Sequence, residues 1–137
     1  MALGVGILII THGGIGTELM KTALNTIGDR PLLIEALAVP QGGDVDRIDA
    51  RAEALRNKLD SGNGVLVLTD MYGSTPSNIA NRLRRHPKVA VVSGVNLPML
   101  MRVLNYPKLG IEELVDKATS GGHDGIMLCA NHHETPP

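Results

Sequence analysis

Two side chains capable of catalysis follow short apolar runs of the sequence. His12 follows the run 5–10, and Asp70 follows the run 64–68. Both runs are typical of buried strands, and ligands of open parallel sheets lie beyond the carboxyl ends of the strands. We therefore expect the two side chains to meet at one edge of a sheet.

An aspartate that accepts a hydrogen bond from one imidazole nitrogen fixes the tautomer of the ring. The other ring nitrogen then keeps a free lone pair and can act as a nucleophile. The sequence therefore predicts that His12 is a catalytic nucleophile and that Asp70 orients it.

A segment that can hold an anion follows Asp70. Thr75 and Pro76 predict the start of a helix, with Thr75 as the N-cap, and helix N-termini bind anions through unpaired N–H groups. Gly73 lets the backbone come close, and the hydroxyls of Ser74 and Thr75 are possible donors. We expect Gly73, Ser74 and Thr75 to bind a phosphoryl group transiently, since these loops contain no Lys or Arg.

Each of these features also has a purely structural interpretation. A histidine or an aspartate after a strand is often a turn residue or a cap, and Thr-Pro is often only a helix start. Dinucleotide, Walker and hydrolase motifs are absent from the sequence. The four residues that suggest a metal site are interpreted as incidental, so no metal and no cofactor are predicted; they are His123, His132, His133 and Glu134.

Apolar runs alternate with helical patterns along the chain, which predicts an α/β fold. We expect a mostly parallel open sheet with helices on both faces, in the flavodoxin-like strand order 2-1-3-4 plus a short C-terminal strand over 125–130. Gly28 is expected to end the first helix, Asp44 to cap the second, and Gly121-Gly122 to stop the last. Residues 1–130 are predicted to form one domain and 131–137 a polar tail.

The composition excludes several classes of protein. The chain has 137 residues, two Tyr and no Phe or Trp, so it lacks aromatic platforms for nucleic-acid bases. The basic cluster at 82–88 is too small for a nucleic-acid surface. No apolar run is long enough to span a bilayer and no signal-peptide pattern begins the chain, which favours a cytoplasmic protein without membrane insertion. The single cysteine, Cys129, is predicted to be a buried, inert thiol.

Three segments together resemble the mannose-family enzyme IIA domain of the bacterial phosphoenolpyruvate-dependent sugar phosphotransferase system. They are residues 6–13, 67–76 and 92–100. The resemblance implies that the phosphocarrier protein HPr phosphorylates His12, that Asp70 hydrogen-bonds the imidazole, and that Thr75 supplies a hydroxyl where the family typically has Ser. It also implies a homodimer that exchanges its C-terminal strand.

The resemblance implies a IIB-type acceptor, which we expect on a separate chain because no IIB domain follows in this sequence. Three other functions stay open at this point. One is a regulatory module whose phosphorylation state controls partner binding, and another is the phosphoryl-donor subunit of a dihydroxyacetone kinase. The third is a flavodoxin-like small-molecule-binding domain without chemistry, which the lack of aromatic residues disfavours.

Overall fold

The computed structural model describes residues 4–130, and its four strands form one parallel sheet in the order β2-β1-β3-β4. This confirms the predicted α/β fold and strand order. The strands are β1 (Gly6–His12), β2 (Ile34–Val39), β3 (Val65–Thr69) and β4 (Val89–Ser93). The helices are α1 (Ile15–Ile27), α2 (Val45–Leu59), α3 (Thr75–Arg82), α4 (Leu97–Leu104) and α5 (Ile111–Asp124), with the short 3-10 helix η1 (Leu83–Arg85) after α3.

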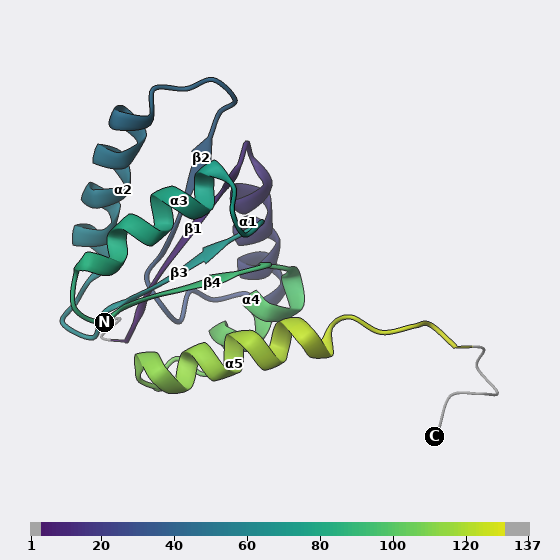
Figure 1. Ribbon diagram of the computed structural model, residues 1–137. Coiled ribbons are helices and arrows are strands. Elements are labelled where there is room, and N and C mark those ends of the chain that lie inside the picture. The colour runs from purple at the N-terminus through teal and green to yellow at the C-terminus, as the bar shows by residue number, and fades with distance from the viewer. Residues whose placement is uncertain (1–3, 131–137) are drawn as a thin grey trace.

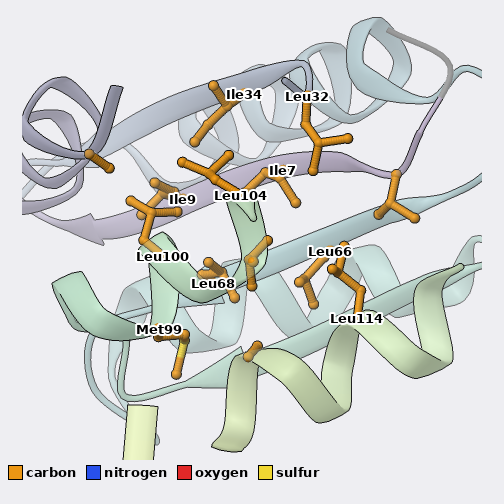
Figure 2. Packing of buried hydrophobic residues seen from close by; sticks show 14 residues of the cluster. Ile7, Ile9, Leu32, Ile34, Leu66, Leu68, Met99, Leu100, Leu104 and Leu114 are labelled. Atoms are coloured by element: carbon orange, nitrogen blue, oxygen red, sulfur yellow. The ribbon is translucent and has the colours of Figure 1, made fainter. Parts of the chain in front are cut away.

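Helices cover both faces of the sheet, with α2 and α3 on one face and α1, α4 and α5 on the other (Figure 1). Successive side chains of a strand point to opposite faces, so β1 contributes to two separate cores. Ile7 and Ile9 pack in the core on the α1 side (Figure 2), whereas Leu8 and Ile10 pack in the core under α2 and α3. All four side chains are fully buried, which explains the unbroken apolar run.

Two predicted helix boundaries are confirmed. Gly28 ends α1 in the left-handed conformation, with φ of 78°, and its N–H bonds to the Leu24 carbonyl. The Asp44 carboxylate accepts hydrogen bonds from the N–H groups of Asp46 at 3.0 Å and Arg47 at 3.4 Å, so it caps α2.

The predicted strand over 125–130 is wrong for the single chain. After α5 these residues leave the domain without forming a strand (Figure 1). A strand requires a neighbouring strand, and this segment pairs with neither β2 nor β4, the two edge strands of the sheet within residues 4–130. Ile126 is 76% exposed and Leu128 is 95% exposed. Cys129 is also exposed, so the prediction of a buried thiol is wrong. The proposed tail over 131–137 lies outside the described residues.

The prediction that Gly121 and Gly122 stop the last helix is also wrong, because α5 continues to Asp124. The two glycines allow α5 to lie close to α4. A Cβ on Gly121 would lie 2.6 Å from the Cβ of Arg102, and one on Gly122 would lie 2.9 Å from Cε of Met99. Close helix packing therefore requires glycine at positions where propensity alone disfavours it.

The variant Gly121→Ala distinguishes the effect of helix propensity at this position from the effect of packing between α4 and α5. If Gly121 served only as a weak helix position, alanine would stabilise the protein by about 1 kcal/mol. We expect instead that the added methyl group separates α4 from α5 and destabilises the protein by about 1–3 kcal/mol. Urea denaturation measures the difference. Asp116→Ala, at an exposed position of the same helix, is the control and should stabilise the protein by at most about 0.7 kcal/mol through helix propensity.

The carboxylate of Asp60 fixes the turn between α2 and β3, and it predicts a pH dependence of stability. The Gly62 N–H bonds to this carboxylate at 2.8 Å, and this bond is the largest cause that lowers the pKa of Asp60. The Gly64 N–H and the Arg56 guanidinium lower it further. The folded state thus binds this proton less readily than the unfolded state, in which the pKa is about 3.9.

The stabilisation from Asp60 should therefore be complete above about pH 5 and should be lost as the pH falls below about 4. Urea denaturation of wild type and Asp60→Asn, from neutral pH to well below about pH 4, tests this. We expect the wild type to be the more stable protein at neutral pH and the difference to shrink in acid. If the difference in the free energy of unfolding stays constant down to the lowest pH measured, the Asp60 charge does not stabilise the fold.

Candidate active site

The candidate site lies where the chain changes direction across the sheet. His12 is the last residue of β1, and Asp70 directly follows β3, the neighbouring strand. From β1 the chain crosses to β2 on one side, whereas β3 is followed by β4 on the other side. The two residues therefore flank the point at which parallel sheets open a crevice at their carboxyl edge.

One oxygen of Asp70 holds His12 at two points. Oδ2 lies 2.9 Å from the ring Nδ1 of His12 and also accepts a hydrogen bond from the His12 backbone N–H at 3.1 Å. Because a carboxylate only accepts hydrogen bonds, this contact assigns the proton of the neutral ring to Nδ1. Nε2 then keeps its lone pair. The structure thus brings together the two residues that the sequence predicted to meet.

Burial differs between the two partners in a way that suits a nucleophile and its support. The Asp70 side chain is only 14% exposed, whereas the His12 side chain is 47% exposed. The carboxylate is therefore held inside the edge of the sheet while the ring remains accessible.

A groove of about 710 Å³ opens beside His12, between the 40–43 loop and the start of α3. His12 continues the row of Leu8 and Ile10 along β1, so it points to the side of the sheet that α2 and α3 cover. The lining is largely apolar and includes no Lys or Arg. It consists of His12, Gly13, Val39, Pro40, Gln41, Gly42, Gly43, Val45, Ile48, Thr75 and Pro76.

The predicted phosphoryl-binding residues occupy different places around this groove. Thr75 lines it, and Gly73, with φ of 81°, forms the turn before α3. Ser74 is not among the lining residues, and its hydroxyl donates to the Met71 carbonyl at 2.6 Å.

The prediction that Thr75 caps α3 is wrong by one residue. Ser74 is the N-cap, in extended conformation, and its carbonyl accepts the N–H of Asn78 at 2.9 Å. Thr75 is the first residue of the helix, and its hydroxyl makes no hydrogen bond within residues 4–130. The Thr75 hydroxyl is therefore available on the groove side of the helix start.

Residues 40–43 also line the site, although none of them was predicted as a site residue. They form the wall of the groove opposite α3. The available signal was their position directly after β2, at the same edge of the sheet as His12. Of the four residues considered as a metal site, only His123 lies in the described part of the chain. Residues 4–130 contain no cluster of three metal-ligating side chains.

No helix within residues 4–130 combines the length and the apolar character needed to cross a membrane.

Comparison with known proteins identifies the family. The family model EIIA-man, described as the PTS system fructose IIA component, matches residues 6–119. The mannose-specific EIIAB component of Escherichia coli K12 is 33% identical over 127 residues, which cover 89% of this chain and 38% of that protein. The chain therefore spans well under half the length of this relative. The fructose-specific EIIA component of Bacillus subtilis is 25% identical over 134 residues and is covered to 90%.

The fold has close counterparts among solved structures. The mannose/sorbose-specific IIA subunit of Enterococcus faecalis superposes with a TM-score of 0.83 over 93% of this chain and 96% of that one, at 22% identity. The PTS IIA protein associated with the fucose utilization operon of Streptococcus pneumoniae gives a TM-score of 0.73 at 28% identity, over 85% and 90% of the chains. With the family model matching most of its length, this chain belongs to the mannose/fructose family of phosphotransferase-system IIA components.

Proposed function

We propose that this protein is a phosphoryl relay in which Nε2 of His12 accepts a phosphoryl group from phosphorylated HPr and passes it to a IIB-type acceptor. The observation that carries the proposal is the contact between Nδ1 of His12 and Oδ2 of Asp70, which leaves Nε2 as the nucleophilic atom of the ring. Membership of the IIA family supports the reaction class.

The transfer step follows from this geometry. The Nε2 lone pair forms a bond to phosphorus while the bond between phosphorus and the donor breaks, and that electron pair returns to the donor. The proton on Nδ1 stays in place, so the phosphorylated ring carries a positive charge. The Asp70 carboxylate, 2.9 Å from Nδ1, stabilises that charge.

The phosphoryl oxygens need donors during the transfer. We propose that the Thr75 hydroxyl and the first-turn N–H groups of α3 supply them, and that Gly73 and Ser74 contribute by shaping the turn before the helix. Because the groove lining contains no Lys or Arg, these neutral donors hold the group weakly and allow it to leave.

The free edge of β4 and the exposed apolar segment support a homodimer as part of this proposal. Within residues 4–130, β4 pairs with β3 on one side only, and the exposed side chains of Ile126, Met127 and Leu128 follow α5. A second copy pairing this segment with the edge of β4 would bury both features.

His12→Ala tests the proposed function directly. Incubation of the wild type with phosphoenolpyruvate, enzyme I and HPr should give an acid-labile, base-stable label on the protein. The variant should take up no label because the accepting nitrogen is gone. His123→Ala, which removes an exposed histidine on α5, is the matched control and should label normally. A label retained in His12→Ala would exclude His12 as the acceptor.

Asp70→Ala tests the role of the carboxylate. With its acceptor removed, the ring should no longer favour the Nδ1–H form, and long-range ¹H–¹⁵N spectra should show a larger share of the Nε2–H tautomer. Phosphoryl uptake should slow by about 10–100-fold. Asp49→Ala breaks an ion pair with Arg82 instead, so it controls for the loss of a carboxylate elsewhere on the protein. A wild-type tautomer and rate in Asp70→Ala would show that orientation does not depend on Asp70.

A further inference from the structure

A buried threonine links the turn that carries His12 to the helix that follows it. Thr11 has no exposed surface. Its hydroxyl accepts the Gly16 N–H at 2.8 Å and donates to the His12 carbonyl at 3.2 Å. A hydroxyl has one proton and two lone pairs, so both bonds can exist at once. The Thr11 side chain therefore bridges the residues on either side of the turn.

Thr11 cannot act on the phosphoryl group directly. It lies in the row of Ile7 and Ile9, on the face of β1 that α1 covers, whereas His12 points to the opposite face. The groove beside His12 does not include Thr11. Any effect of Thr11 on the reaction is thus transmitted through the backbone of the turn.

The hydroxyl supplies the cap that α1 otherwise lacks. Gly14 is the N-cap of α1 and has no side chain to offer, while Gly16 lies in the first turn, where N–H groups have no partner within the helix. The fit is close, because a Cβ on Gly16 would lie 2.9 Å from Cγ2 of Ile9 and 3.1 Å from Oγ1 of Thr11. Glycine at this position brings the helix start within reach of the hydroxyl.

The peptide group between His12 and Gly13 is held from both sides. Its carbonyl accepts from Thr11, and its N–H donates to the Val39 carbonyl at 3.0 Å. The preceding peptide N–H, that of His12, bonds to Oδ2 of Asp70. The backbone on both sides of the His12 Cα atom is therefore fixed relative to the carboxylate that the ring must reach.

We propose that Thr11 is a positioning residue for His12: its hydroxyl fixes the His12–Gly13 peptide against the start of α1, so that the backbone N–H and the ring Nδ1 of His12 reach the same Asp70 oxygen. The effect on transfer rate rests on the proposed relay function. The effect on the orientation and tautomer of His12 does not.

Thr11→Val is the main test, because valine keeps the β-branched shape but lacks the hydroxyl. We expect a folded protein in which the Nε2–H tautomer of His12 gains population in long-range ¹H–¹⁵N spectra. Uptake of the phosphoryl group from phosphorylated HPr should slow by at least roughly tenfold, up to the roughly 10²-fold that misplacement of a reacting group causes. Thr11→Ser retains the hydroxyl and should restore both the tautomer and most of the rate.

Thr69→Val is the matched control for the loss of a buried hydroxyl. Thr69 is also fully buried and ends the neighbouring strand, but its hydroxyl pairs with that of Ser93 at 3.0 Å. We expect Thr69→Val to lower the melting temperature as Thr11→Val does while leaving the His12 tautomer unchanged. If Thr69→Val reproduces the spectral change and the slower uptake, general destabilisation explains both and the proposal is overturned.

Gly16→Ala reaches the same contact from the other side and remains informative if Thr11→Val does not fold. Its methyl group would move the helix start away from the Thr11 hydroxyl, so the tautomer should shift in the same direction. Wild-type spectra and rates in a folded Thr11→Val or Gly16→Ala would overturn the proposal. If the wild type takes no label on His12, the relay function fails, and the spectra still decide the role of Thr11.

Discussion

The site depends on a single carboxylate oxygen that binds one histidine at both its backbone and its ring. Because Oδ2 of Asp70 accepts from the N–H and from Nδ1 of His12, the ring orientation is set relative to the residue's own backbone. In the proposed relay, this contact orients the nucleophile before a partner binds. The binding of the partner therefore does not have to offset the conformational entropy that orientation costs. The adjacency of β1 and β3 in the sheet is the structural condition for the contact.

The register of β1 and β3 is fixed because both strands are buried on both faces. A shift of one residue would move Ile10 out of the core under α2 and α3 and would turn His12 away from the groove. The same alternation separates two tasks at the end of β1. His12 faces the groove, while Thr11 faces α1 and contacts the start of that helix. One short strand thus carries both the proposed reacting group and the residue that we propose positions it.

The parts of this arrangement that follow from local pattern were predictable from the sequence, and the parts that depend on long-range packing were not. Apolar runs and glycine turns predicted the alternation of strands and helices, and the flavodoxin-like order expected for that alternation predicted the meeting of His12 with Asp70. Gly121 and Gly122 were misinterpreted because their function is contact with α4, which sequence periodicity does not describe. The 125–130 segment has the composition of a strand, but it runs away from the sheet (Figure 1) and pairs with neither edge strand within residues 4–130. The 40–43 loop forms a wall of the groove beside His12 only because β2 pairs with β1, and the local sequence pattern does not describe that pairing.

In the proposed relay, the charges around the groove favour a transfer that continues from His12 to the acceptor. Asp70 stabilises a positive ring but repels the phosphoryl oxygens, and the groove lining contains no cation to offset that repulsion. A fixed arginine or lysine there would form charge-assisted hydrogen bonds to the phosphoryl group and lower the free energy of the phosphorylated state. Neutral donors at the start of α3 stabilise it less, so the phosphorylated and free forms stay closer in free energy. On this view the net stabilisation of the phosphorylated ring comes chiefly from the contact between Nδ1 and Asp70, the same contact that orients the free ring for attack.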